Sequence, residues 1–238
     1  MKKFLALLLS GLMVLSLAAC GGETATEDTS TEDTENTENT DTAESDLAYV
    51  QDKGTLVVGI TYFEPMDYKA EGSDEWIGFD ADMAKAFAES LGVDVEFQEI
   101  TWDYKVEELD SKAIDCVWNG MTLGEDVMAA MGTSVPYCTN AQVLVVPADK
   151  AADFEGLTSL EGLNVAVESG SAGEDAAIAL GATTVPVQSQ ANTLMEVSAG
   201  TSDAAVIDLL MAGAMIGEGT SYPDLTYTDR LTEEEYGV

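Results

Sequence analysis

Thr55-Leu56-Val57-Val58-Gly59-Ile60 is a short apolar run rich in β-branched residues, and it predicts a buried strand. A helical pattern over residues 80–91 follows, and Gly92 ends that helix because glycine readily adopts a left-handed conformation. Residues 93–100 then alternate between apolar and polar side chains, as a second strand would. Strands that alternate with helices predict an α/β fold with a largely parallel sheet.

Further segments extend this first unit. Asp80 is expected to cap the helix over residues 80–91, which places Met83, Phe87 and Leu91 on one apolar face. The pattern also predicts a helix over 102–112, with Val106 and Leu109 turned inward, and strands over 114–118 and 142–146, the last ended by Pro147.

The alternation starts again after Pro147. Strands are predicted over 163–168, 183–187 and 204–207, and helices over 174–180, 191–199 and 209–216. Two successive α/β units predict two lobes, lobe one over residues 47–146 and lobe two over residues 147–238. Ligands of open α/β sheets bind beyond the carboxyl ends of the strands, and ligand sites favour domain interfaces, so the predicted site is a cleft between the lobes.

The first residues have the pattern of a secretory signal. Lys2 and Lys3 precede an apolar stretch over residues 4–17 that is shorter than the roughly 20 residues of a membrane-spanning helix. The following Leu17-Ala18-Ala19-Cys20 resembles the lipobox of bacterial lipoproteins, in which Cys20 would be acylated, with palmitate for example, after cleavage of residues 1–19. The alternative is an ordinary signal peptide with a coincidental cysteine.

Residues 20–46 are nearly all small, polar or acidic, and they cannot bury enough apolar surface to offset their conformational entropy. We therefore expect a disordered acidic tether that holds the folded part away from the cell membrane.

The composition excludes several classes of function. The chain has 9 basic and 45 acidic residues, which argues against nucleic-acid binding. It has no histidine, the most common general base and metal ligand, and we expect no cofactor, no metal site and no catalytic residues. Cys116 and Cys138 could form a disulfide or remain as two buried free thiols.

Six segments together resemble family 3 of the bacterial extracellular solute-binding proteins: residues 54–59, 76–84, 115–122, 136–137, 160–167 and 203–208. The resemblance implies a two-lobed, type II periplasmic-binding fold that closes on its ligand by hinge motion. It implies a subunit that delivers an amino acid to the permease of an ABC importer, and we expect this subunit to be a monomer anchored through the lipid on Cys20. It also implies that the chain returns to lobe one after Val238, so that the C-terminal part of lobe one would be missing from this sequence.

The resemblance assigns roles to two polar residues of lobe two. Asp208 matches the carboxylate that pairs with the ammonium group of the ligand, although it could instead cap the helix that begins at Leu209. Ser171 lies in a loop of small residues, 169–173, and would contact the ligand carboxylate, although it could be an ordinary helix cap.

Lobe one is expected to supply aromatic walls and polar groups to the same site. The candidate residues are Tyr62, Phe63, Trp102, Asn119, Gly120 and Thr122. For the aromatic residues the alternative is a place in the core, and for Asn119 it is a role in shaping its loop.

One position departs from the family pattern. Members that bind α-amino acids usually have an arginine five residues after the threonine that corresponds to Thr122, and here that position is Val127. The strongest carboxylate clamp is therefore absent. Either backbone and hydroxyl donors alone hold the ligand carboxylate, or the ligand is not a standard α-amino acid. The acidic Asp208 and Glu64 would suit a cationic or amine-bearing solute.

Three other functions remain open from the sequence alone. The first is a ligand-sensing domain that reports to a membrane receptor. The second is a dehydratase-type enzyme on the same fold, and the third is a structural surface lipoprotein.

Overall fold

The computed structural model describes residues 45–238, so the predicted signal peptide 1–19 and Cys20 lie outside the described residues. The first helix, α1 (Asp46–Lys53), begins within the last residues of the predicted 20–46 tether. Ser45 caps it, because the Ser45 hydroxyl accepts a hydrogen bond of 3.1 Å from the Ala48 amide.

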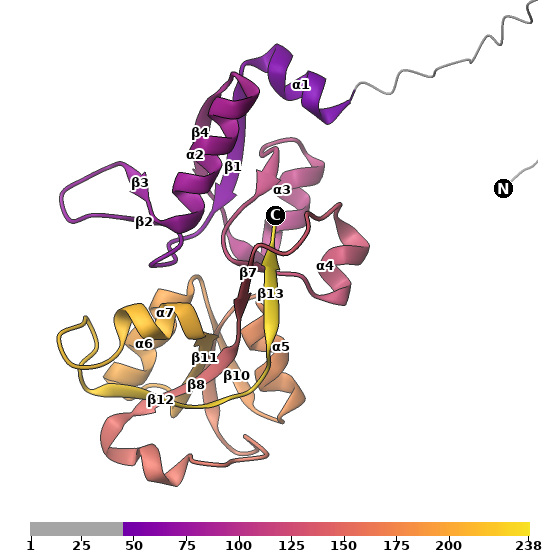
Figure 1. Ribbon diagram of the computed structural model, residues 1–238. Coiled ribbons are helices and arrows are strands. Elements are labelled where there is room, and N and C mark those ends of the chain that lie inside the picture. The colour runs from indigo at the N-terminus through magenta and orange to yellow at the C-terminus, as the bar shows by residue number, and fades with distance from the viewer. Residues whose placement is uncertain (1–44) are drawn as a thin grey trace, which may run out of the picture. The chain divides into compact units, whose positions relative to one another are not determined.

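Lobe one is built on a three-stranded parallel sheet, which lies in the upper part of Figure 1. Its strands in order are β4 (Asp94–Glu99), β1 (Thr55–Ile60) and β5 (Cys116–Val117), flanked by α2 (Phe79–Leu91), the short 3-10 helix η1 (Trp102–Tyr104) and α3 (Lys105–Asp110). The predicted strand over residues 55–60 is confirmed in full, whereas the strand predicted over 114–118 is reduced to two residues.

Helix α2 packs on lobe one with a face different from the predicted one. Its buried residues are Asp80, Ala81, Ala84 and Ala88. Met83 and Phe87, predicted to point inward, are 40% and 46% exposed. The small alanine side chains allow a close approach to the sheet, and the larger apolar residues are left on the outer side.

Asp80 does not cap α2, because the N-cap position is Gly78 and Asp80 lies in the first turn. The Asp80 carboxylate is fully buried and accepts hydrogen bonds from the Gly120 amide at 2.6 Å and from the Tyr137 hydroxyl at 2.8 Å. It therefore fixes the loop after β5, where Gly120 has a φ of +55° and an added Cβ would lie 2.5 Å from Phe63.

Lobe two is built on a five-stranded mixed sheet in the lower part of Figure 1. Its strands in order are β10 (Thr183–Val187), β9 (Asn164–Glu168), β11 (Ala204–Asp208), β8 (Gln142–Pro147) and β12 (Leu225–Arg230), with helices α5 (Ala172–Ala179), α6 (Gln190–Ala199) and α7 (Leu209–Met215). Strands β10, β9 and β11 are parallel to one another, and β8 is antiparallel to both of its neighbours.

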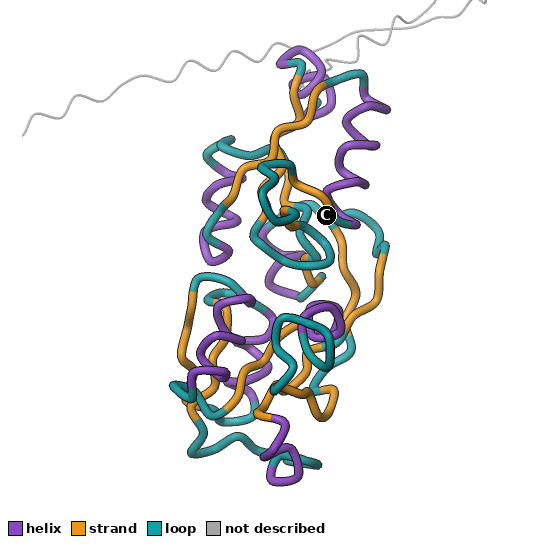
Figure 2. The backbone as a smooth tube through the Cα atoms, turned by 90° about the vertical axis from the view of Figure 1, so that its left-hand side faces the viewer, coloured by secondary structure: helices purple, strands orange, loops and turns teal. Residues whose placement is uncertain are grey.

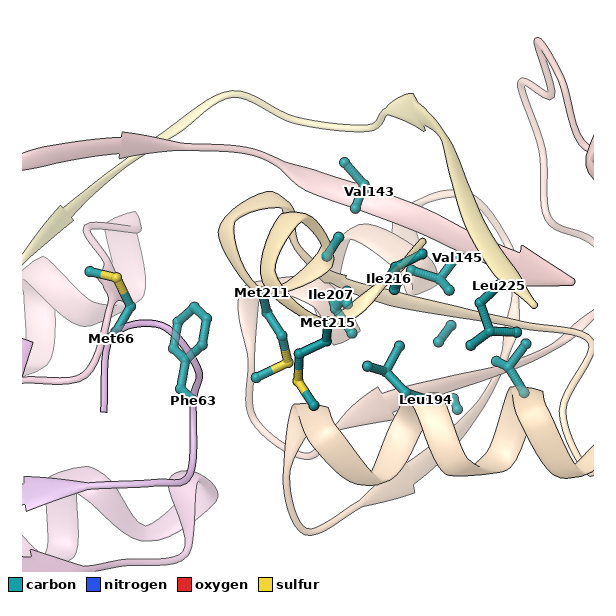
Figure 3. Packing of buried hydrophobic residues seen from close by; sticks show 14 of the residues in the cluster. Phe63, Met66, Val143, Val145, Leu194, Ile207, Met211, Met215, Ile216 and Leu225 are labelled. Atoms are coloured by element: carbon teal, nitrogen blue, oxygen red, sulfur yellow. The ribbon is translucent and has the colours of Figure 1, made fainter. Parts of the chain in front are cut away.

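Alternate residues of the central strands of lobe two enter two separate cores. From β8, Val143 and Val145 pack on one face with Leu194, Met211 and other residues of α6 and α7 (Figure 3). Leu144 and Val146 of the same strand pack on the other face with residues of α5 and η2 (Ala148–Asp153). This two-sided burial explains why β8 is a continuous apolar run rather than an alternating one.

The chain crosses between the lobes twice. Strand β8 belongs to the sheet of lobe two, so the first crossing precedes Gln142 and does not fall near Pro147, where the sequence analysis placed the junction. The second crossing lies between Arg230 and Glu234, inside the chain, whereas the family resemblance placed it after Val238.

The two crossings meet in a small antiparallel sheet of β6 (Met121–Thr122), β13 (Glu234–Gly237) and β7 (Cys138–Asn140). Figures 1 and 2 show β7 and β13 running side by side between the two larger sheets. The sequence indicated only the start of a strand at Tyr236 and did not predict β7, because a pairing between residues about a hundred positions apart leaves no local periodic pattern.

The remaining described elements are β2 (Tyr68–Lys69), β3 (Trp76–Ile77) and α4 (Glu125–Ala130). Cys116 and Cys138 are free thiols, which decides between the two alternatives left open by the sequence. Within residues 45–238, no helix is long and apolar enough to cross a membrane.

We predict that Asp67→Asn makes folding less sensitive to pH. Asp67 is fully buried, neither carboxylate oxygen has a hydrogen-bond partner, and burial raises its pKa to about 9, with the nearby Asp80 carboxylate adding to the effect. A raised carboxyl pKa contributes stability at low pH that is lost as pH rises through the window from about 4 to about 9.

Urea unfolding at pH 5, 6.5 and 8 measures this effect. The unfolding free energy of the Asp67→Asn variant should fall less steeply than that of the wild type, by up to about 1.4 kcal/mol per pH unit. The exposed Asp74, replaced by Asn, should leave the slope unchanged. Equal slopes for Asp67→Asn and the wild type would refute the assignment.

Candidate functional site

A cavity of about 320 Å³ is lined by residues of both lobes. Lobe one contributes the segment from Trp102 to Lys105 and the loop from Asn119 to Val127, and lobe two contributes residues near the carboxyl ends of β9 and β11. Thr232 and Glu234 of the second crossing complete the lining. The predicted location of the site, beyond the strand ends and between the lobes, agrees with this cavity.

Asp208 lines the cavity and is 3% exposed. Its carboxylate accepts hydrogen bonds from the side-chain amides of Asn140, Gln142 and Gln190, and from the Tyr236 hydroxyl at 2.5 Å. It makes no capping hydrogen bond to α7, the alternative role that the sequence had left open.

Asn140 supplies the cap instead, because its side-chain oxygen accepts a hydrogen bond of 3.3 Å from the Leu210 amide. The carboxylate of Asp208 is therefore free of the helix terminus and is held by side chains around the cavity.

Burial raises the pKa of Asp208 to about 8, with the Glu234 carboxylate as the next cause. Glu168, at the end of β9, is likewise 3% exposed, and burial followed by the charge of Asp208 raises its pKa to about 8. The Lys105 ammonium group acts in the opposite direction on Glu168, but the pKa values of Glu168 and Asp208 stay raised, so the arrangement favours a further cationic group at this end.

Ser171 has the capping role that the sequence left open, and it also lies in the cavity lining. Its hydroxyl caps α5 by accepting a hydrogen bond of 3.1 Å from the Glu174 amide. The Glu174 carboxylate in turn accepts a hydrogen bond of 2.8 Å from the Gly170 amide, which closes the loop as a capping box does.

Lys105 provides a cation that the sequence analysis missed. It is 9% exposed, and its ammonium group donates hydrogen bonds to the carbonyl oxygens of Gly170 at 3.0 Å and Trp102 at 3.3 Å, the first of them across the cleft. Burial lowers its pKa, while the carboxylates of Asp126, Asp103, Glu168 and Asp175 act in the opposite direction. The ammonium group lies 4.9 Å from the centre of the Trp102 ring.

The predicted residues of the loop after β5 all reach the cavity. Asn119, Gly120 and Thr122 line it together with Trp102. The side-chain amide of Asn119 is also occupied by Thr61, since it accepts from the Thr61 amide at 2.9 Å and donates to the Thr61 hydroxyl at 2.8 Å. Asn119 therefore has the loop-shaping role that the sequence left open, and it also lines the cavity.

Two predicted aromatic residues do not line the cavity. Phe63 is 2% exposed and packs edge-on against Tyr236 in the core, with ring centres 6.4 Å apart. Tyr62 packs against Trp76, and its hydroxyl donates a hydrogen bond of 3.1 Å to the Lys69 carbonyl. Glu64 is also absent from the lining, whereas Val127 is part of it.

Glu168, Gln142, Gln190 and Glu234 are cavity residues that the sequence analysis did not select. Glu168 ends a strand, as Asp208 does, and an acidic residue at a strand end is a signal that could have selected Glu168. Gln142 is paired with Asp208 in the antiparallel register of β8 and β11, which no local pattern reveals.

Two α/β lobes joined by paired crossings, with a polar cavity lined from both, define a two-lobed binding protein. The chain belongs to the bacterial extracellular solute-binding proteins, family 3, whose model matches residues 56–213. The family resemblance and the two-lobed α/β fold inferred from the sequence are thereby confirmed.

Named proteins resemble the chain over most of its length. The arginine-binding extracellular protein ArtP of Bacillus subtilis is 26% identical, over 98% of this chain and 84% of ArtP. The arginine-bound form of a truncated ArgBP from T. maritima has a TM-score of 0.71 and 30% identity, covering 79% of this chain and 89% of that protein. The ancestral amino acid-binding protein AncCDT-1, a precursor of cyclohexadienyl dehydratase, has a TM-score of 0.71 and 32% identity, covering 81% and 84%.

We predict that Tyr236→Phe destabilises the fold by about 1.5–3 kcal/mol, the usual worth of a hydrogen bond to a charged group. Tyr236 is fully buried, and the change removes the donor to Asp208 while keeping the ring. Chemical denaturation at pH 8.5, where Asp208 is largely ionised, measures the loss. The partly exposed Tyr227, changed to Phe, is the matched control, and a loss below 0.5 kcal/mol for Tyr236→Phe would contradict the network.

Proposed function

We propose that the chain is the extracytoplasmic substrate-binding subunit of an ABC importer and captures an amino acid or a related amine-bearing solute between its lobes. The observation that supports this most is the buried carboxylate of Asp208 in a cavity lined from both lobes. The amino-acid-binding relatives named above support the same class of ligand.

Within this proposal, each group of a zwitterionic ligand has a partner. The ligand ammonium group pairs with Asp208. The ligand carboxylate, which lacks the usual arginine because position 127 is valine, is received by the Lys105 ammonium group and by the loop that contains Ser171. Trp102 gives an apolar wall, and Asn119, Gly120 and Thr122 form the edge of the site.

The proposed role is binding without catalysis. Asp208 accepts hydrogen bonds from four side chains, which suits a fixed anchor better than an acid–base group that must exchange its proton with a substrate. The permease of the importer is the proposed protein partner, and the chain is proposed to act as a monomer.

A panel of ligands tests the binding proposal. Thermal denaturation of the wild type with L-amino acids and small amines should show stabilisation that grows with the concentration of cationic or neutral amino acids. Asp208→Asn should remove most of that stabilisation, because the ligand ammonium group loses its charged partner. The exposed Asp153 of lobe two, changed to Asn, removes the same charge and should bind as the wild type does. Preferential binding of acidic amino acids, with no binding of amines, would reject the proposed ligand class.

We also propose that the protein is anchored through a lipid on Cys20 and extends from the membrane on the acidic tether. The expected consequence is that Cys20→Ala moves the protein from the detergent phase to the aqueous phase in a Triton X-114 partition and abolishes labelling with radioactive palmitate. If the Cys20→Ala variant stayed in the detergent phase, a lipid anchor at Cys20 would be excluded. Cys138→Ala is the matched control and should leave both readouts unchanged.

A further inference from the structure

We propose that Glu168 and Gln142 form a second cation-binding subsite in the cavity, so that the protein selects amino acids with a cationic side chain over neutral ones. The inference rests on the proposed function, because it specifies the ligand of the same cavity.

The first support is a pair of buried acceptors without partners. Glu168 Oε1 and Gln142 Oε1 have no hydrogen-bond partner, and both residues line the cavity at 3% and 2% exposure. Buried polar atoms in folded proteins are nearly always hydrogen-bonded, and an unmet acceptor is costly. Two such acceptors on residues that line the same cavity indicate a site for a group that only donates hydrogen bonds.

The second support is the contrast with Asp208. Its two oxygens accept hydrogen bonds from four side chains of the protein, so its hydrogen-bonding capacity is largely used. The side-chain nitrogen of Gln142 donates hydrogen bonds to the carboxylates of Asp208 at 3.1 Å and Glu234 at 2.8 Å. These bonds fix the side chain and leave only its oxygen unpaired. The free acceptors of the cavity are therefore distinct from the Asp208 anchor.

The third support is the balance of charge. Among residues 45–238, the cavity lining has five carboxylates, those of Asp126, Glu168, Asp175, Asp208 and Glu234, and Lys105 is its one cation. A single ligand ammonium group compensates Asp208, and Lys105 offsets only part of the negative charge around Glu168, whose pKa stays raised to about 8. A guanidinium or second ammonium group compensates Glu168, and neither has an acceptor that would compete with the two unpaired oxygens.

Arginine and citrulline form the matched pair of probes, because the ureido group of citrulline has nearly the shape of a guanidinium group but no charge. Isothermal titration of the wild-type protein at pH 8 should show at least a 30-fold preference for L-arginine. Glu168→Gln should reduce that preference at least 10-fold, mainly through weaker binding of arginine. Binding of citrulline by Glu168→Gln shows that the variant is folded.

Two further measurements complete the test. Glu155→Gln removes an exposed carboxylate of lobe two and should leave the preference unchanged, which separates a local effect from the general charge of the protein.

Arginine binding near pH 7 should release protons, because a cation favours the ionised form of Glu168. Titration in buffers of different ionisation enthalpy detects this release. Asp208, Glu234 and Lys105 also face this region, and the part of the release lost in Glu168→Gln is the part due to Glu168.

The outcomes separate the two levels of the proposal. Tight binding of neutral amino acids with no preference for arginine, or a preference that survives Glu168→Gln, overturns the subsite and leaves the proposed function intact. The same holds if the two acceptors are satisfied by water alone, since arginine and citrulline would then bind equally. Failure of every amino acid and amine to bind the wild type rejects the proposed function and the subsite together.

Discussion

The buried carboxylate of Asp208 joins more parts of the molecule than any other side chain described above. Its hydrogen-bond donors are Asn140 of β7, Gln142 of β8, Gln190 of α6 and Tyr236 of β13. Strands β7 and β13 belong to the crossings between the lobes, whereas strand β8 and helix α6 belong to lobe two. The same charge that anchors the cavity therefore fixes the crossings, so the requirements of the fold and of ligand binding meet at one residue.

The sequence predicted most of the regular structure, because strands such as residues 55–60 and 183–187 are decided by local side-chain pattern. It misplaced the lobe junction, because β8 joins its sheet through pairing with distant strands that periodicity does not reveal. It also chose the wrong face of α2. Large apolar residues were expected inside, but close packing of alanines and the buried Asp80 carboxylate determine the orientation of that helix.

The sequence selected residues of the cavity lining where the family pattern assigns a polar side chain, as at Asp208 and Ser171. The prediction was incomplete where a side chain reaches the cavity from the first residue of a helix or strand, as those of Lys105 in α3 and Gln142 in β8 do. Lys105 lies on a helix, and only the approach of the loop at Gly170 places its ammonium group in the cleft. Phe63 was wrongly selected as a site residue, because an aromatic residue that follows a strand can pack in the hydrophobic core instead of lining a ligand site.

The charge of the cavity wall also acts on the rates of exchange. Carboxylates near the entrance, such as those of Asp126 and Asp175, attract a cation over a distance of about a Debye length and accelerate its encounter with the cleft. Groups in the interior act only after contact, and they determine how long a ligand stays. Arrival is thus sensitive to the salt of the surroundings, whereas residence time is set by buried groups that salt scarcely screens. A protein with this division can fill quickly from a dilute medium and still hold its cargo long enough for transfer.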